Sequence, residues 1–387
     1  MKVLQVNDYR CGKGVGGCEV VMETTVSLLR AAGIDVEVFT SDDVESVRPT
    51  PLSYIDSRRC GRALARVMAR FRPDVVHLHN FYHVLSPGIL AVVGVYRRDH
   101  RLRVVMTAHD YHLACPNAGL FHVRRGRYHH ADVDHLQSLA YLLSRRWDER
   151  SVGYSLLKTL QHLWNYRVHD RRRVIDCILC PSRFLRDVVS RLGLATALVP
   201  YPIPDVRQNA ARPTDELELV FAGRVEREKG VAEFLELMPA DFSGRLTIVG
   251  EGSQLKRCRA VCRHRGLESR VDFAGRLPRA DVLELIGRSH VLVLPSLWVE
   301  NHPMSLLEAL ACGTSILVSD LGGMREIVDD SGVGFTFAPG DAAGLAASLE
   351  QISEAFRAGT LNGFDASAFL DARSESRYLD AILATYV

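Results

Sequence analysis

Residues 290–313, HVLVLPSLWVENHPMSLLEALACG, contain the pattern on which the fold assignment rests. A short run of Val and Leu leads into a loop, and a helical sequence follows. Pro303 suits the first turn of that helix and Gly313 suits its end. A short apolar run followed by a helix is typical of a parallel strand that is covered on both faces. We therefore interpret the stretch as a strand–loop–helix unit.

The same alternation recurs along the whole chain. Apolar bursts separated by amphipathic stretches are KVLQVN, DVEVFT, DVVHLH, RVVMTAH, CILCPS, ALVPYP, LELVFAG, RLTIVGEG, RVDFAG, HVLVLPS and SILVSD. Strands that alternate with helices predict βαβ units with right-handed crossovers, and hence an α/β fold with doubly wound sheets. Such sheets bind ligands beyond the carboxyl ends of their strands. We therefore expect the functional residues in loops that follow strands.

A chain of 387 residues exceeds what one core usually serves, so two domains are expected. A proline-rich break follows the burst ALVPYP, and the apolar pattern restarts with LELVFAG. The prolines of this break are Pro200, Pro202, Pro204 and Pro213. We predict a first domain over 1–203, a second over 204–370 and a terminal helix over 371–387. Basic, His-rich sequence at 121–173 interrupts the first domain and includes the helical candidate SLLKTLQHLWNYRVHDRRRV.

Composition narrows the class of protein. Hydrophobic residues make up 47% and charged residues 24%, which is typical of a folded soluble chain. The chain has no apolar run of the ~20 residues that span a bilayer, and MKVLQVN has the pattern of a strand, not of a signal peptide. Nine cysteines without a signal peptide predict a reducing compartment, and we expect a cytoplasmic location. The CxxC of Cys177 and Cys180 lies in an apolar run, so we predict no metal.

Charge is distributed unevenly. Residues 1–200 carry a net charge of +10 and the remainder −8. This asymmetry suits an anionic ligand held between two domains. Nucleic acid is not expected, because the arginines are dispersed and no DNA- or RNA-binding motif accompanies them.

Two motifs in the second half predict binding of a nucleotide diphosphate. After the strand VLVLPS, the amides of Met304, Ser305 and Leu306 would form a positive helix mouth suited to phosphate. Glu308 lies behind that mouth, where a carboxylate can accept two ribose hydroxyls, and Glu300 lies in the preceding loop. The alternative is an ordinary helix start that happens to carry two acids.

The second of these motifs is FAGRVEREKGV, directly after a strand. Arg224 and Lys229 flank its turn, and two fixed cations can neutralise a diphosphate without magnesium. The alternative is a solvated charge run.

In FAGRLP, the backbone of Gly275, Arg276 and Leu277 could meet a base edge. In SDLGGMREIV, two glycines precede a helix.

Two motifs in the first half suggest sugar and phosphate contacts. In MTAHDYHLACPN, His109 and Asp110 follow a strand, where the imidazole could bond a sugar hydroxyl. The glycine loop of residues 12–17 formally satisfies the dinucleotide fingerprint GxGxxG, but it does not turn straight out of its strand. We expect instead that the amides of Gly16 and Gly17 approach a phosphate or sugar.

Together these motifs resemble the GT-B retaining glycosyltransferases of family 4, along almost the whole chain. The resemblance implies two Rossmann-like domains with an interdomain cleft, and a terminal helix that crosses back to the first. It implies that Glu308 holds the ribose and that Arg224 and Lys229 hold the diphosphate. The amides after Pro303 would hold phosphate and sugar hydroxyls. The resemblance assigns further residues to contacts with the sugar, the diphosphate or the base of the donor. These are His109, Glu300, Gly16, Gly17, Gly275, Arg276 and Leu277.

Where the family carries Phe-Gly after the first Glu, this sequence has Asn301-His302-Pro303-Met304, which affects the donor sugar. Asp110, His112 and Asn117 are weaker candidates on the acceptor side. The catalytic set implied is His109, Glu300, Arg224 and Lys229, with retention and no metal or other cofactor. Retention by two displacements would need a carboxylate nucleophile, for which Glu300 is the only candidate. We expect front-face substitution instead.

The resulting hypothesis is transfer of a hexose or amino-hexose from a nucleotide-diphospho-sugar, UDP being favoured, to a small polar acceptor. An aminocyclitol of antibiotic biosynthesis is the example. One alternative is a peripheral-membrane enzyme that uses the basic stretch 145–173 on anionic lipid. Further alternatives are a GT-B nucleotide-sugar epimerase, an NAD-dependent oxidoreductase and a non-catalytic sugar-nucleotide sensor.

Overall fold

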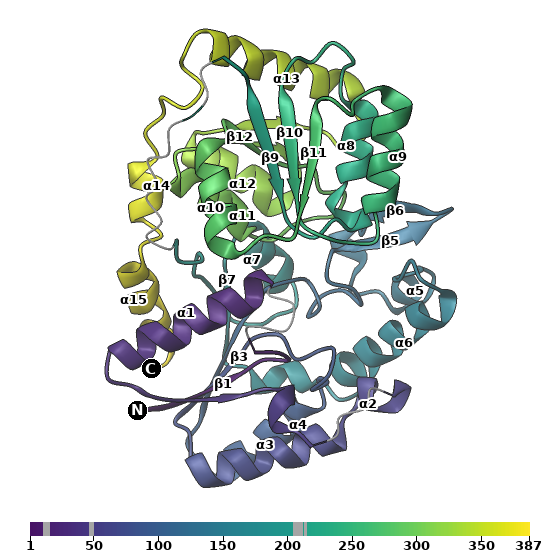
Figure 1. The fold of residues 1–387 in the computed structure, drawn as a ribbon. Helices are drawn as coiled ribbons and strands as arrows, with labels where there is room; N and C mark the ends of the chain where they lie inside the picture. The colour runs from purple at the N-terminus through teal and green to yellow at the C-terminus, as the bar shows by residue number, and fades with distance from the viewer. Residues whose placement is uncertain (11–15, 46–49, 204–211, 213–214) are drawn as a thin grey trace. The chain divides into compact units, whose positions relative to one another are not determined.

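Parallel strands form the centre of two separate units in the computed structural model, which describes residues 1–10, 16–45, 50–203, 212 and 215–387 (Figure 1). The first unit comprises Met1–Tyr201 with Glu375–Val387, and the second comprises Pro202–Ser374. The sequence predicts the corresponding domain boundaries between residues 203 and 204 and between residues 370 and 371. Each unit is a helix-covered parallel sheet, which confirms the predicted α/β class of two Rossmann-like halves. Most of the proline-rich break lies outside the described residues.

The sheet of the first unit has six parallel strands in the order β2-β1-β3-β4-β7-β8. Its strands are β1 (Lys2–Val6), β2 (Asp35–Phe39), β3 (Val75–Leu78), β4 (Arg103–Thr107), β7 (Cys177–Cys180) and β8 (Thr196–Leu198). Every residue of β3 is buried, as expected for a strand covered on both faces. The chain leaves β1 towards β2 and then returns to the other side of β1 with β3. The loops that follow β1 and β3 are therefore the expected binding loops of this unit.

The sheet of the second unit also has six parallel strands, in the order β11-β10-β9-β12-β13-β14. Its strands are β9 (Glu218–Ala222), β10 (Arg245–Val249), β11 (Val271–Gly275), β12 (Val291–Leu294), β13 (Ser315–Ser319) and β14 (Phe335–Phe337). Here the order reverses between β9 and β12. The loops that follow these two strands are therefore the expected binding loops of this unit.

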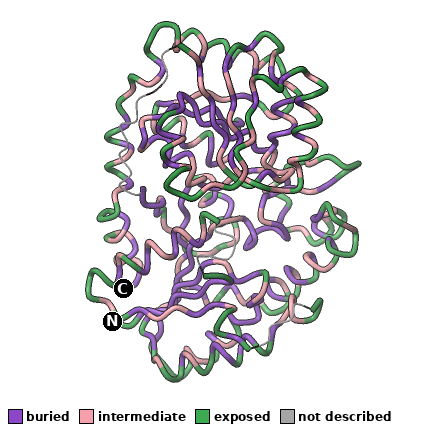
Figure 2. The backbone as a smooth tube through the Cα atoms, in the orientation of Figure 1, coloured by how far each residue is buried: buried purple, intermediate pink, exposed green. Residues whose placement is uncertain are grey.

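Helices cover both sheets, and the buried residues follow the strands and the inward faces of the helices (Figure 2). The first unit contains α1 (Gly17–Ala31), α2 (Pro51–Ile55), α3 (Arg58–Phe71), α4 (Ile89–Asp99), α5 (Leu139–Leu143), α6 (Val152–Leu163), α7 (Arg183–Ser190) and α15 (Glu375–Thr385). The second contains α8 (Val231–Leu237), α9 (Leu255–Arg265), α10 (Arg279–Arg288), α11 (Met304–Ala311), α12 (Gly322–Ser331), α13 (Ala342–Arg357) and α14 (Ser367–Asp371). Within the described ranges, none of these helices has the length and apolarity needed to span a bilayer.

The end of the chain returns to the first unit, as the resemblance implied. Helix α15 packs against α1 (Figure 1), where the hydroxyls of Thr25 and Tyr378 lie 2.7 Å apart. The hydroxyl of Tyr386 lies 2.7 Å from Nδ1 of His77 in β3. Two buried hydrogen bonds thus fix the terminal segment beside the first sheet.

The segment between β4 and β7 differs from the sequence-based expectation. It contains an antiparallel hairpin of β5 (Phe121–Arg124) and β6 (Arg127–His130) that the apolar pattern did not reveal. The long helical candidate is also interrupted: α6 ends at Leu163, and a π-helical turn follows at Trp164–Val168. Asp170 then adopts a φ of 43°, in the left-handed region that a helix cannot continue through.

Candidate active site

The loops after β9 and β12 meet where the order of the second sheet reverses. Lys229 comes from the loop after β9 and Glu300 from the loop after β12, and Lys229 Nζ donates to Glu300 Oε1 at 2.5 Å. Both side chains are largely buried. The sequence placed the two residues in separate motifs, and the strand order brings them together.

Glu300 is the centre of a dense polar cluster. Its Oε1 also accepts hydrogen bonds from the hydroxyl of Ser296 at 2.8 Å and from the indole N–H of Trp298 at 2.6 Å. Burial alone would raise the pKa of the carboxyl, but Lys229 and these donors outweigh it and lower the pKa below its ordinary value. Lys229 Nζ also lies 5.5 Å from the centroid of the Trp298 ring. Glu300 is therefore an ionised carboxylate held in a fixed position.

Two glycines allow the loops to approach this closely. Gly230 has a φ of 69°, and a Cβ there would lie 2.0 Å from the carbonyl oxygen of Pro295. A Cβ on Gly323, at the start of α12, would lie 1.4 Å from the carbonyl oxygen of Asn301. The amide of Gly323 donates to the carbonyl of Glu300 at 3.1 Å. The glycine pair of SDLGGMREIV thus supports the loop that carries Glu300.

Arg224 lies near the same turn but is more exposed. Its guanidinium donates to Glu228 Oε1 at 3.2 Å, and 65% of its side chain is accessible to solvent. An exposed pair of this kind contributes little to stability. Arg224 can therefore exchange Glu228 for an anionic ligand at small cost.

Helix α11 begins at Met304 after Pro303 and leaves its first amides pointing out of the helix. The amide of Leu306 differs from the expectation, because it donates to the carbonyl of Pro303 at 3.2 Å. The phosphate-binding role of the amides of Met304, Ser305 and Leu306 stays a prediction, which at Leu306 would require the loss of this hydrogen bond.

Glu308 is buried in α11, and its Oε1 accepts from the guanidinium of Arg279 at 2.6 Å. Burial raises the pKa of Glu308, while Arg279 acts in the opposite direction. Arg279 starts α10, immediately after the FAGRLP loop, in which Gly275 ends β11 with a φ of 69°. The structure therefore links the loop of Gly275, Arg276 and Leu277 to the carboxylate expected to bind ribose.

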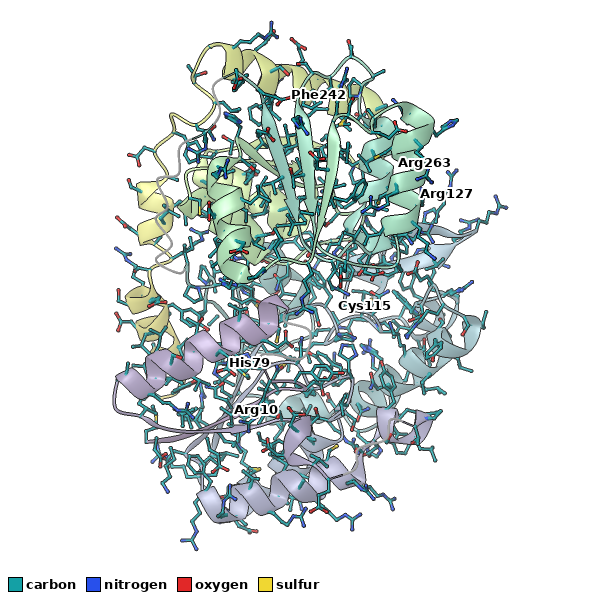
Figure 3. The ribbon with its side chains drawn as sticks, in the orientation of Figure 1. Arg10, His79, Cys115, Arg127, Phe242 and Arg263 are labelled. Carbon is teal, nitrogen blue, oxygen red and sulfur yellow. The ribbon has the colours of Figure 1, made fainter. Side chains whose placement is uncertain are left out.

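His109, which follows β4 in the first unit, belongs to a chain of hydrogen bonds. Its Nδ1 lies 2.6 Å from the hydroxyl of Tyr201 and its Nε2 lies 2.8 Å from Nδ1 of His79. His79, labelled in Figure 3, follows β3, and its Nε2 lies 2.8 Å from Gln5 Oε1. A carbonyl oxygen can only accept, so His79 donates from Nε2 to Gln5, and His109 donates from Nε2 to His79. Tyr201 then donates to His109.

Two of the weaker candidates on the acceptor side, Asp110 and His112, form hydrogen bonds with each other. Asp110 Oδ1 accepts from the amide of His112 at 2.9 Å and lies 3.0 Å from its Nδ1. Burial would raise the pKa of Asp110, but His112 outweighs it and lowers that pKa.

Asn117, the third candidate on the acceptor side, is held by hydrogen bonds within the first unit. Its Oδ1 accepts from the amides of Gly119 and Phe121, and its Nδ2 donates to the carbonyls of Phe121 and Trp147. These four bonds use the whole hydrogen-bonding capacity of an amide side chain. Contact with an acceptor would require one of these hydrogen bonds to break, and the acceptor role of Asn117 stays a prediction.

The helix mouth at Gly16 and Gly17 differs from the expectation in one respect. Gly16 caps α1, and its amide donates to Oε2 of Glu19 at 3.0 Å. The carboxylate of Glu19 thus already accepts from the Gly16 amide at the N-terminus of α1. A phosphate that binds this amide has to displace it. Gly12 and Gly14 of the formal dinucleotide fingerprint lie outside the described residues.

Three possible metal ligands also meet in the first unit. Among the residues that the structure describes, Cys18, His79 and His109 have ligand atoms within 4.8 Å of one another. The 2.8 Å between the two imidazole nitrogens suits a hydrogen bond, and it is shorter than the roughly 3.3 Å between two nitrogens on one tetrahedral zinc. The expectation that no metal takes part stays a prediction.

Acid is expected to destabilise the first unit. Burial lowers the pKa of His109 to about 4 and those of His77 and His162 to about 3. These groups stay neutral in the folded state while the unfolded chain binds protons below pH 6.5. Each therefore removes about 1.4 kcal/mol of stability per pH unit as the pH falls from 6.5 to its folded pKa.

Urea unfolding followed through Trp147 at pH 7, 6 and 5 measures this loss. In His109→Asn the dependence on pH is expected to be shallower by about 1.4 kcal/mol per unit. Equal stability at pH 7 and pH 5 would contradict the neutral assignment.

Comparison with known proteins identifies the family. Residues 15–204 match the family model described as Glycosyltransferase Family 4, and residues 202–355 match the model described as Glycosyl transferases group 1. The chain belongs to the family 4 glycosyltransferases. The predicted membership and fold are thus confirmed.

Relatives of this glycosyltransferase differ in what their names say they use. A glycogen synthase of Mycobacterium tuberculosis is 36% identical over 37% of this chain and 36% of its own length. A 2-deoxystreptamine N-acetyl-D-glucosaminyltransferase of Streptomyces fradiae is 33% identical over 42% of this chain and 44% of its own. A GDP-mannose-dependent phosphatidylinositol dimannoside mannosyltransferase of Mycobacterium tuberculosis is 27% identical over 70% and 63%. The glycosyltransferase thus spans only part of the length of these relatives.

Solved structures share the fold over the whole chain. The sucrose-phosphate synthase of Thermosynechococcus elongatus has a TM-score of 0.71 at 18% identity, covering 100% of this chain and 98% of its own. Anabaena HepE in complex with UDP-glucose has a TM-score of 0.65 at 18% identity, covering 100% and 99%. At this identity the likeness establishes the fold.

Several residues of the candidate site were not foreseen from the sequence. Ser296 and Trp298 bind Glu300, Arg279 binds Glu308, and His79 and Tyr201 bind His109. A usable signal existed for Ser296 and His79, because both lie within two residues of the end of a strand. Arg279 and Tyr201 carried no such signal, since their roles arise from contacts distant in sequence.

Proposed function

We propose that this glycosyltransferase moves a hexose or amino-hexose from a nucleotide-diphospho-sugar to an acceptor hydroxyl. The observation that carries the proposal is the Lys229–Glu300 pair at the strand-order reversal of the second sheet. An ammonium fixed in a largely buried site is suited to a diphosphate, since it needs no rearrangement as the leaving group gains charge.

The donor roles follow from the second unit. Lys229 and Arg224 neutralise the diphosphate together with the amides of Met304 and Ser305. Glu308, oriented by Arg279, accepts the ribose hydroxyls. The loop of Gly275, Arg276 and Leu277 meets the base edge. UDP is the proposed nucleotide, and the complex of Anabaena HepE with UDP-glucose supports that choice.

The proposed reaction retains the anomeric configuration. Glu300 is held by three donors on one oxygen, so it is better suited to grip sugar hydroxyls than to attack the anomeric carbon. We therefore propose front-face substitution, in which the departing phosphate oxygen takes the proton of the acceptor. Lys229, Arg224 and the helix amides stabilise the charge on that oxygen, which is why no metal is assigned a step.

His109 is proposed to contact the donor sugar. Burial keeps its imidazole neutral at pH 7. A sugar hydroxyl would replace Tyr201 or His79 as partner of one ring nitrogen. Gly16 and Gly17 are proposed to approach the diphosphate, with release of the Gly16 amide from Glu19.

The proposed acceptor is a small polar compound with a cyclitol ring. The Streptomyces fradiae relative, which acts on 2-deoxystreptamine by its name, supports an aminocyclitol and a place in antibiotic biosynthesis. The eight cysteines in the described residues are all free thiols, which supports a reducing, cytoplasmic location. Asp110 is the acid proposed on the acceptor side.

A second candidate acceptor is a lipid-borne sugar or cyclitol. Exposed apolar side chains gathered between residues 139 and 168 favour this alternative. The phosphatidylinositol dimannoside mannosyltransferase among the relatives is consistent with it.

A panel of UDP-, GDP-, ADP- and dTDP-sugars tests the donor by thermal shift, because a bound ligand stabilises the folded state. Glu308→Gln is expected to weaken binding of the preferred nucleotide by about 1.5–3 kcal/mol, roughly 10- to 100-fold, since a charged acceptor is lost. Glu354→Gln, on the exposed face of α13, is the matched control. A chain whose melting temperature no nucleotide sugar raises would refute the proposal.

A further inference from the structure

Helix α6 and the π-helical turn after it bury polar side chains. Ser155, Thr159, Gln161 and Asn165 all face the protein and are buried. The amide of Gln161 donates to the carbonyls of Tyr54 at 2.5 Å and Tyr82 at 2.9 Å, and Asn165 Nδ2 donates to the carbonyl of Ile55 at 2.9 Å. Polar contacts therefore attach this segment to the first unit, where an ordinary surface helix would use an apolar face.

The outward face is apolar instead. Val152, Leu156, Leu160, Trp164 and Val168 recur every four residues, and they are between 42% (Trp164) and 71% (Val152) exposed. Residues four apart lie on the same side of a helix, so these side chains form one row, which we call the apolar stripe. The segment is amphipathic with its apolar side turned to solvent.

Exposed apolar side chains are concentrated here. Of the fourteen large hydrophobic residues that are exposed in the described part of the chain, eight lie between residues 139 and 168. Besides the apolar stripe, they include Leu139 and Leu143 on α5 and Tyr154 on α6. Single exposed apolar residues are common, but a contiguous gathering marks a surface that meets a partner.

The charge next to the apolar stripe indicates the partner. Residues 139–173 contain eight Lys and Arg against three Asp and Glu, a net charge of +5, although Arg172 is buried and Arg171 is paired with Asp56. Directly after Val168, a surface groove of about 630 Å³ begins, lined by residues of α4 and of the segment 169–174. Its charged and titratable lining is Arg97, Arg98, Arg171, Arg173, His169 and Asp170. We call it the basic groove.

We propose that the apolar stripe and the basic groove together dock this glycosyltransferase on an anionic lipid bilayer. Apolar side chains would enter the boundary between headgroups and acyl chains. Arg97 and Arg171 are paired with Asp176 and Asp56, so the exposed Arg98 and Arg173 would meet lipid phosphates. A second copy bound through the same face would bring two positively charged segments together, which disfavours a dimer. The proposal holds for whichever acceptor the enzyme uses.

Vesicle co-sedimentation of the full chain tests the docking without donor or acceptor, so its failure is separate from failure of the proposed function. The vesicles are phosphatidylcholine alone or an equal mixture with phosphatidylglycerol. The wild type is expected to bind the anionic mixture, with a blue shift of Trp164 fluorescence. The variant Leu156→Ser, Leu160→Ser, Trp164→Ser is expected to bind about 100-fold more weakly, because it loses three inserted side chains.

Matched variants separate docking from folding and from general charge. Leu198→Ser with Val387→Ser removes exposed apolar side chains elsewhere and is expected to bind as the wild type does. Arg98→Glu with Arg173→Glu is expected to weaken binding to the anionic mixture on the order of 10-fold or more. Lys256→Glu with Arg263→Glu, on α9 of the second unit, makes the same change in charge and is expected to have a much smaller effect.

Three outcomes would overturn the proposal. The wild type could fail to bind the anionic vesicles. The stripe variant could bind them as tightly as the wild type. Finally, sedimentation without vesicles could show a dimer that the stripe variant abolishes, in which case the apolar stripe would belong to an interface between two copies.

Discussion

Lys229→Met is expected to lower turnover by about 100- to 1000-fold, because the variant removes a fixed cation from the position where the leaving diphosphate gains charge. It is also expected to cost about 3 kcal/mol of stability in the second unit, since Glu300 stays buried without its ammonium partner. Steady-state kinetics and urea unfolding followed through Trp298 measure the two effects. Lys256→Met, an exposed lysine of α9, serves as control.

The double variant Lys229→Met with Glu300→Gln separates the two roles of the lysine. A neutral amide at position 300 no longer needs a cation, so stability is expected to recover while turnover stays low. The stability difference between Lys229→Met and the wild type is also expected to shrink in acid. The pair stabilises the fold above the ordinary pKa of a glutamate and is lost as the pH falls through the lowered pKa of Glu300. Full recovery of turnover in the double variant would show that Lys229 has only a structural role.

Gly323→Ala is expected to destabilise the second unit by about 3 kcal/mol or more, because its Cβ would lie 1.4 Å from the carbonyl oxygen of Asn301. Backbone must move to relieve that contact, and the segment that moves carries Glu300. We therefore expect nucleotide binding to fall together with stability, as measured by thermal shift with and without the preferred nucleotide.

Gly363→Ala is the matched control for this substitution. Its nearest foreign atom would be the carbonyl oxygen of Thr360 at 3.6 Å, an ordinary contact, so stability is expected to stay within about 1 kcal/mol of the wild type. Near-wild-type stability and nucleotide affinity in Gly323→Ala would mean that the Glu300 loop tolerates displacement. This result would contradict the proposal that Glu300 binds sugar hydroxyls from a fixed position.

Much of the fold could be predicted because parallel strands leave a strong local signal. Each of the apolar bursts from KVLQVN to SILVSD overlaps a strand of one of the two sheets. The hairpin β5–β6 was missed because its second strand, RYHH, is largely exposed and has no apolar run. The long helical candidate was overextended because helical periodicity continues past Leu163, whereas the break at Asp170 depends on backbone conformation.

The candidate site divides in the same way. The sequence by itself placed Glu300, Glu308, Arg224 and Lys229 in loops and helix starts after strands, since the residue order along a βα unit fixes that much. Only the tertiary structure decided that Lys229 donates to Glu300 and that Asn117 donates to the carbonyls of Phe121 and Trp147. It also decided that α6 turns its apolar row outward. Periodicity tells which residues share a face of a helix, but the direction of that face depends on hydrogen bonds to residues about 80 to 110 positions away.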